Sequence, residues 1–212
     1  MNTMLTNPMF YSGLLVVFYV FVGTLAISLP LGLILALARM SRFAPLRLMT
    51  QIYVTVMRGT PLLLQLIFIY YGLPNIGIVL DRLPSALIAF ILNYAAYFVE
   101  IYRGGLESIP KGQFEAARTL GFDTRTTYKR VILPQVVKRI LPPISNEVIT
   151  LVKDTALVYA IGVVDMLRVS QIEMNRTASL TPLLYSAAAY LIIVIGLTYL
   201  LQRLEKRLAY YK

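Results

Sequence analysis

Several acidic, amide and hydroxyl side chains lie inside apolar stretches of this sequence, where they are able to bind a polar solute. Glu147 and Asp154 are seven residues apart, so a helix places them two turns apart on one face, with Thr150 between them. Asn93, Tyr97 and Glu100 follow one another at i, i+4 and i+7 and form a second polar stripe. We predict that the two stripes face each other and form one binding site.

An internal ion pair is the alternative explanation for these charges. A charged side chain at membrane depth costs about 2.5–3.5 kcal/mol on insertion scales, so each one needs a partner or a function. Lys153 could neutralise Glu100 or Asp154 and thereby hold two helices together. Glu147, Asn93 and Tyr97 are therefore the stronger candidates for contact with a solute.

Residue usage excludes most hydrolase active sites. The sequence contains no cysteine and no histidine, which removes disulfides, the usual zinc and iron sites, thiol nucleophiles and histidine bases. It also contains no G-x-x-x-x-G-K-[ST] phosphate-binding loop. We predict no catalytic residue, no metal site and no cofactor in this chain.

The apolar residues are gathered into long runs without charge. Hydrophobic residues make up 58% of the 212 positions, against about 45–50% in soluble proteins. Charge-free runs cover residues 1–38, 59–80, 83–99 and 177–202. About 20 apolar residues in a helix cross the ~30 Å core of a bilayer. A soluble protein with large buried helices is the alternative, but runs of this length are rare in soluble cores.

We therefore predict an all-α integral membrane protein with a single transmembrane domain over residues 1–212. Five transmembrane helices are expected, and Pro30 predicts a kink in the first of them. The fourth is the least regular, because it carries Glu147, Lys153 and Asp154. The five spans cover about 14–38, 53–73, 83–102, 140–164 and 183–201.

The basic residues predict an orientation. Sixteen Arg and Lys side chains, including Arg58 just inside the second span, fall on the side that holds the 1–2 connection, the 3–4 connection and the tail, against three on the other. Basic residues mark the cytoplasmic side, so the N-terminus is expected outside and the C-terminus in the cytoplasm. The net charge of +10 then reflects topology, and nucleic-acid binding is the weaker explanation.

The longest polar segment, about 103–139, connects the third and fourth spans and predicts two short helices. The first covers about Gly112–Leu120, and Gly121 fits the left-handed residue that closes it. Asp123 or Thr124 caps the second, which Pro134 is expected to end. This pattern predicts an amphipathic cytoplasmic platform. The alternatives are a loop that packs on its own helices and a helix-turn-helix for DNA.

Within this segment stand Glu115-Ala116-Ala117, Gly121 and Ile132-Leu133-Pro134. Their types and spacing resemble the signature loop of ABC importer permeases. Further segments are similar to the polar amino-acid uptake subgroup, the histidine, arginine and glutamine type of permease, and Ala156 departs from the serine usual there. These segments are Arg58-Gly59-Thr60-Pro61, Glu100-Ile101-Tyr102-Arg103-Gly104-Gly105, Pro110-Lys111-Gly112-Gln113 and Lys153-Asp154-Thr155.

The resemblance implies partners and a location in the plasma (inner) membrane of a prokaryote. The first short helix would dock on a cytoplasmic dimer of ABC ATPases, which would bind ATP and Mg, so ATP hydrolysis is expected on another chain and this chain is not expected to be an enzyme. A second permease chain, identical or a paralogue with the homodimer favoured, and an extracytoplasmic amino-acid-binding protein complete the assembly within membrane lipid. The coupling residues implied are Glu115, Ala116, Ala117, Leu120 and Gly121.

We accordingly predict the permease subunit of an ATP-driven amino-acid importer that carries a polar amino acid. The acidic excess on the two stripes favours a cationic substrate such as arginine, lysine or histidine. The substrate-binding candidates are Asn93, Tyr97, Glu100, Glu147, Thr150 and Asp154. The rival interpretations are an ion-coupled secondary amino-acid transporter, which the buried acids suggest, and a membrane scaffold without transport activity.

Overall fold

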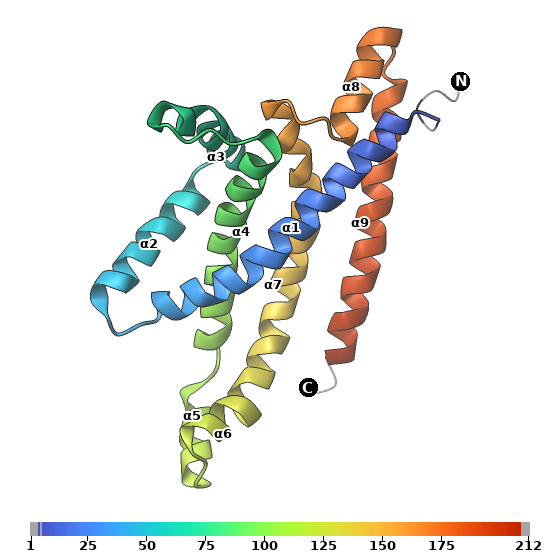
Figure 1. Cartoon of the computed structure of the whole chain (residues 1–212). Coiled ribbons are helices and arrows are strands. Elements are labelled where there is room, and N and C mark those ends of the chain that lie inside the picture. The colour runs from blue at the N-terminus through green and yellow to red at the C-terminus, as the bar shows by residue number, and fades with distance from the viewer. Residues whose placement is uncertain (1–3, 5, 209–212) are drawn as a thin grey trace.

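The computed structural model describes residues 4 and 6–208, and in this part of the chain the regular structure is helical (Figure 1). Three helices are long and apolar enough to cross a membrane: α1 (Pro8–Arg39), α4 (Arg82–Glu107) and α9 (Thr181–Leu208). A bent pair of helical segments, Ala44–Gly59 and Leu62–Ile76, makes a fourth if it counts as one span. The all-helical prediction is confirmed, and the count of five spans stays a prediction.

α1 lies obliquely across α4, and a glycine allows the two backbones to approach (Figure 1). A Cβ atom at Gly32 would stand 2.6 Å from the Cβ of Phe98 and 3.1 Å from the carbonyl oxygen of Ala95. Such contacts are too short for any side chain, so the crossing requires glycine at this position. Pro30 lies inside α1, which continues without interruption to Arg39.

The prediction of one continuous helix over 53–73 is wrong. α2 (Ala44–Gly59) ends at Thr60, whose backbone is extended at φ −120° and ψ 147°, and α3 (Leu62–Ile67) begins after Pro61. α3 continues through η1 (Phe68–Gly72) and η2 (Leu73–Ile76), and the two parts meet at 105°. The cause is Pro61, because proline lacks an N–H and disfavours helical backbone in the residue before it. Hydropathy does not reveal such a break, because the residues on both sides of it are apolar.

Pro134 does not end the second short helix, which corrects a further expectation. After α5 (Lys111–Thr119), the helical segments α6, η3 and α7 follow one another without a loop between them. Pro134 lies in the first turn of α7, directly after the π-helical segment η3, and helical backbone continues through it. The segment between α4 and α7, residues 108–132, is therefore shorter than the predicted connection 103–139. The segments are α6 (Thr124–Thr126), η3 (Thr127–Ile132) and α7 (Leu133–Asp154).

Two further differences lie within residues 140–177. The predicted span 140–164 is not one α-helix, because α7 ends at Asp154 and a 3₁₀ segment, η4 (Thr155–Ile161), follows it. α8 (Met166–Thr177) was not predicted, although Asp165 caps it by accepting hydrogen bonds from the backbone N–H groups of Leu167 and Arg168 at 3.1 and 3.0 Å. An acidic residue at this position is a recognisable N-cap signal.

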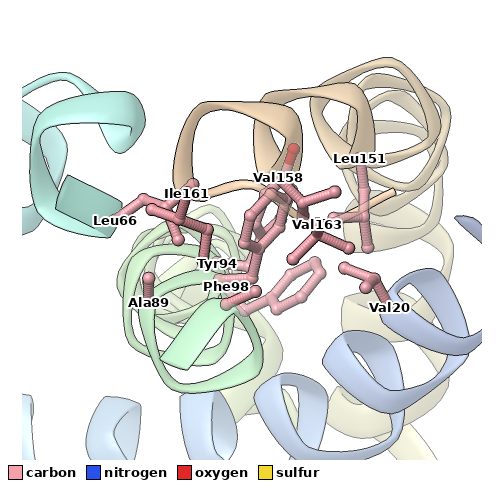
Figure 2. Packing of buried hydrophobic residues seen from close by; sticks show 11 residues of the cluster. Val20, Leu66, Ala89, Tyr94, Phe98, Leu151, Val158, Ile161 and Val163 are labelled. Carbon is pink, nitrogen blue, oxygen red and sulfur yellow. The ribbon is translucent and has the colours of Figure 1, made fainter. Parts of the chain in front are cut away.

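The buried core lies where α1, α3, α4, α7 and η4 meet (Figure 2). Tyr94 and Phe98 of α4 lie at its centre, with Leu66 of α3 and Leu151 of α7 around them. In contrast, the outer surface of α9 remains apolar and exposed, with Ile192 at 70%. Figure 1 shows α8 at the same end of the bundle as the start of α1, whereas α5, α6 and the end of α9 lie towards the opposite end.

Candidate functional site

A cavity of about 610 Å³ lies between the α2–α3 break, α4, and α7 with η4. The break supplies backbone and small side chains, and the helices supply polar groups. The lining residues are Arg58, Gly59, Thr60, Pro61, Leu62, Leu63, Asn93, Tyr94, Tyr97, Glu147, Thr150, Asp154 and Leu157. The two predicted polar stripes therefore do face one common space.

Five of the six proposed substrate-binding residues line this cavity, and Glu100 is not among the residues that line it. The Glu100 carboxylate is held by Arg103, which donates hydrogen bonds from Nη2 at 2.5 Å and from Nε at 3.1 Å. Arg103 also donates to Glu107 at 2.5 Å. Glu100, Arg103 and Glu107 form a charged cluster in the last turns of α4. The structure thus gives Glu100 a partner other than Lys153.

Asp154 is bound by a tyrosine that the sequence analysis did not single out. The hydroxyl of Tyr94 donates to Asp154 Oδ2 at 2.7 Å, and its ring is buried in the core (Figure 2). Lys153 is exposed, and within the described residues no ion pair closer than 4.0 Å joins it to Asp154 or Glu100. Tyr94 lies outside the periodic stripe of α4, so no local pattern pointed to it.

Asn93 both lines the cavity and supports the helix break. Its side-chain amide donates to the Met57 carbonyl at 2.9 Å and to Gln65 Oε1 at 3.1 Å. The Gln65 amide donates to the carbonyls of Met57 and Thr60 at 2.9 and 3.2 Å, and to Thr60 Oγ1 at 2.8 Å. These carbonyls lie where the helical ladder stops at Pro61. Gln65 was missed by the sequence analysis, and its signal is a single amide inside an apolar run just after a proline.

Glu147 and Arg58 are the two cavity charges without a close polar partner. Glu147 is half-buried and makes no hydrogen bond or ion pair with the described residues. The guanidinium of Arg58 stands over the ring of Tyr97, 5.1 Å from its centroid, and likewise has no hydrogen bond or ion pair among the residues described. The sequence analysis placed Arg58 just inside the second span and counted it with the basic residues of the cytoplasmic side, but it did not predict that Arg58 lines the cavity.

The predicted coupling residues lie on α5 and the turn that follows it. Gly121 adopts φ 76°, and the N–H of Phe122 donates to the Ala117 carbonyl at 3.0 Å, which closes the helix as expected for a left-handed C-terminal glycine. Glu115, Ala116 and Leu120 are exposed, Leu120 at 72%, whereas Ala117 is buried. The ring of Phe114 packs edge-on against the ring of Tyr128, with 5.9 Å between the ring centroids, and this contact joins α5 to η3.

Asp123 caps the segment after this turn. Its Oδ1 accepts a hydrogen bond from the backbone N–H of Thr126 at 3.0 Å. The hydrogen bonds from Thr126 hold the pKa of Asp123 below its ordinary value. The predicted choice between Asp123 and Thr124 as the cap is therefore settled in favour of Asp123.

Apolar helices around a polar cavity, with an exposed helical turn at one end, define a membrane transport permease. The chain belongs to the family of binding-protein-dependent transport system inner membrane components, whose sequence profile matches residues 28–210. This confirms the resemblance to ABC importer permeases and identifies an inner-membrane permease family.

Two curated relatives from Bacillus subtilis (strain 168) show the similarity over most of the chain. The L-cystine transport system permease protein TcyB is 44% identical over 183 residues, which cover 85% of this chain and 78% of TcyB. The arginine transport system permease protein ArtQ is 39% identical over 203 residues, which cover 95% of this chain and 93% of ArtQ. Both relatives are permeases of amino-acid transport systems.

Solved structures agree with this assignment. The crystal structure of an amino acid ABC transporter with histidines contains a chain that is 36% identical to this one, with a TM-score of 0.88 over 94% of each chain. A chain of the MetNI methionine ABC transporter in an inward-facing conformation is 20% identical with a TM-score of 0.70 over 94% of each chain, and this likeness concerns the fold alone.

Proposed function

We propose that this chain is the permease subunit of an ATP-driven amino-acid importer and that its substrate crosses the membrane through the cavity between α4 and α7. The observation that carries the proposal is the cavity itself, in which Glu147 and Asp154 face the same space as Asn93, Tyr97 and Thr150. Carboxylates suit the ammonium group that every free amino acid carries. The amino-acid permeases among the relatives support the same substrate class.

A cationic amino acid such as arginine, lysine or histidine is the substrate that we favour. The relatives named above are described for different amino acids, L-cystine and arginine, so the preference rests on the cavity. Glu147 has no partner within the described chain, and Asp154 adds a second carboxylate. A substrate with two positive groups is able to bind both carboxylates, whereas a neutral amino acid has a single ammonium group and leaves one carboxylate without a positive partner.

We further propose that the exposed face of α5 docks on a cytoplasmic ATPase dimer, which binds ATP and Mg. A second permease chain, most simply an identical copy, and an extracytoplasmic amino-acid-binding protein would complete the importer. Leu120 and the small Ala116 are exposed on α5, which supports close contact with a partner surface. In this proposal α7 with η4 is a further membrane crossing and α2–α3 a bent one, which makes five.

Substitution of one carboxylate tests the substrate site. In proteoliposomes that contain the complete importer, Glu147→Gln should weaken the uptake of radiolabelled L-arginine or L-lysine, while basal ATP hydrolysis survives. Loss of one desolvated charge partner should cost about 2–5 kcal/mol of apparent affinity. Glu205→Gln is the matched control, because Glu205 is also half-buried but lies on α9 and is not among the residues that line this cavity.

The other outcomes of this experiment reject the proposal. Lower thermal stability of Glu147→Gln with unchanged affinity would return Glu147 to a packing role. Uptake that follows an ion gradient and not ATP hydrolysis would identify a secondary transporter. A complex that hydrolyses ATP but moves no amino acid would favour the scaffold interpretation.

Reporter fusions test the orientation. A reporter after Lys212 should be cytoplasmic, and one within 165–181, the connection that contains α8, should be external, because 16 basic residues lie on the predicted cytoplasmic side. An external tail reporter would contradict both the orientation and the five-span topology.

A further inference from the structure

The cavity contains one positive side chain whose role the proposed function leaves open. Arg58 is the last basic residue of α2 and lies next to the break at Thr60–Pro61. Its guanidinium shares the cavity with Glu147 and Asp154. Arg58 is exposed in the single chain, and it has no hydrogen bond or ion pair with the described residues.

Tyr97 gives Arg58 a defined position without consuming its hydrogen-bond donors. The guanidinium lies 5.1 Å from the centroid of the Tyr97 ring, within the range of a cation–π contact. The N–H groups of Arg58 make no hydrogen bond with the described residues, so its donors are available to a ligand. A planar fork of N–H donors matches a carboxylate in a bidentate arrangement.

The opposite charges of the cavity are separate from each other. Glu147 and Arg58 both line the space of about 610 Å³, yet no ion pair closer than 4.0 Å joins them. A free amino acid carries an ammonium and a carboxylate, so it is able to lie between an unpaired acid and an unpaired guanidinium. The lining then holds one positive and two negative side chains, and a substrate with one net positive charge balances it.

We propose that Arg58 binds the carboxylate of the transported amino acid and makes the cavity selective for substrates with a free α-carboxylate. Glu147 binds an ammonium group of the same molecule. This inference rests on the proposed function, because it assumes that an amino acid occupies the cavity.

The test compares acids with their amides. The permease–ATPase complex is purified in nanodiscs without the binding protein, and binding of L-arginine, L-lysine, L-glutamine and L-cystine is measured by calorimetry beside the α-amide of each. The wild-type complex should bind the acid at least about 30-fold more tightly than the amide, which corresponds to about 2 kcal/mol for a buried charge-assisted pair. Arg58→Met should remove this preference and leave binding of the amide nearly unchanged.

Matched variants separate recognition from folding. Arg58→Lys keeps a point charge and should retain part of the preference for the acid. Arg47→Met removes an exposed arginine from the same helix outside the cavity residues and should change neither affinity. Glu147→Gln should weaken acid and amide alike, because both carry the ammonium group.

Each remaining outcome decides the question. If Arg58→Met retains the wild-type ratio of acid to amide affinity, Arg58 does not bind the carboxylate, and the proposed function stands. The same holds if the variant weakens acid and amide equally. If the wild-type complex binds none of the four amino acids while it hydrolyses ATP, the cavity is not an amino-acid site, and both proposals are overturned.

Discussion

The described part of the chain contains two kinds of helix. α9 is an uninterrupted apolar helix, whereas the α2–α3 segment is broken by irregular backbone. α9 runs for 28 residues and leaves most of its apolar surface exposed. The α2–α3 segment turns by 105°, and amide side chains of α3 and α4 bind the carbonyls at the turn. α9 satisfies its backbone within the helix, whereas the break depends on partners.

This difference explains where the cavity lies. Its lining comes from the α2–α3 break, from η4, and from the faces of α4 and α7 that pack against them, and neither α1 nor α9 contributes a residue. Irregular backbone is tolerated at membrane depth only where it is buried in protein or lines a polar space. The polar cavity therefore lies beside the breaks, and the uninterrupted helix α4 adds polar side chains to it.

Removal of the amide that supports the break should have the largest effect on stability. Gln65→Leu removes the donor that binds the carbonyls of Met57 and Thr60, and it removes the oxygen that accepts a hydrogen bond from the Asn93 amide. We expect the free energy of unfolding to fall by about 2–4 kcal/mol, measured by denaturant titration in detergent. Gln51→Leu, an exposed site on α2, should change it by less than about 0.5 kcal/mol. Equal effects of the two substitutions would show that the amide does not hold the break.

Gly121 tests the turn that follows α5. Gly121→Val places a β-branched residue at φ 76°, which costs about 1–3 kcal/mol and changes the exit of α5. Gly77→Val is a matched control, because Gly77 has φ 83° and also has open space around it. The Gly121 variant alone should lose co-purification with the ATPase and transport, while it still inserts into the membrane. Loss of association in both variants, or in neither, would contradict docking through α5.

The cap at Asp123 predicts a smaller effect that depends on pH. Hydrogen bonds from Thr126 lower the pKa of Asp123 in the folded chain. Its stabilising contribution is therefore complete above the unfolded value, near 3.9, and is lost as the pH falls through the lower folded value. The Thr126 amide signal in NMR should move with a midpoint below about 3.9, and Asp123→Asn should abolish this movement. A midpoint above that value would contradict the cap.

The smallest effect is expected in a straight helix. Thr198 Oγ1 donates to the Val194 carbonyl at 2.7 Å, one turn back in α9. Because this carbonyl already accepts a helical hydrogen bond, Thr198→Val should change the free energy of unfolding by no more than about 0.5 kcal/mol, measured in the same titration as Gln65→Leu. If Thr198→Val lowers the free energy of unfolding as much as Gln65→Leu does, the two kinds of helix do not differ in this respect.

The straight helices were predictable because charge-free runs mark them directly. α1, α4 and α9 cover the predicted spans 14–38, 83–102 and 183–201, and each extends beyond them because helical hydrogen bonding continues into polar residues. The prediction failed where backbone geometry and hydropathy disagree. The run around Pro61 is as apolar as a span but bends, and the polar helix α8 lay outside the apolar signal.

The lining of the candidate site was predictable from helix faces, whereas the partners of individual side chains were not. The stripe spacing put Asn93 and Tyr97 on one face of α4, and Glu147, Thr150 and Asp154 on one face of α7, and these faces share the cavity. Glu100 continues the same spacing, yet Arg103 binds it in the last turns of α4. Local periodicity describes a helix face and contains no information on which neighbour a terminal residue meets.

The sequence by itself determined the membrane class, the helical fold, the family motif and the polar faces, because each depends on residue type at short spacing. Only the tertiary structure decided that Tyr94 binds Asp154, that Gln65 and Asn93 support the break, and that Arg58 enters the cavity beside Tyr97. These pairs join residues from 8 to 60 positions apart, and the turn of 105° brings Arg58 to α4. Contacts of this kind follow from the packing of whole helices, which a local pattern does not encode.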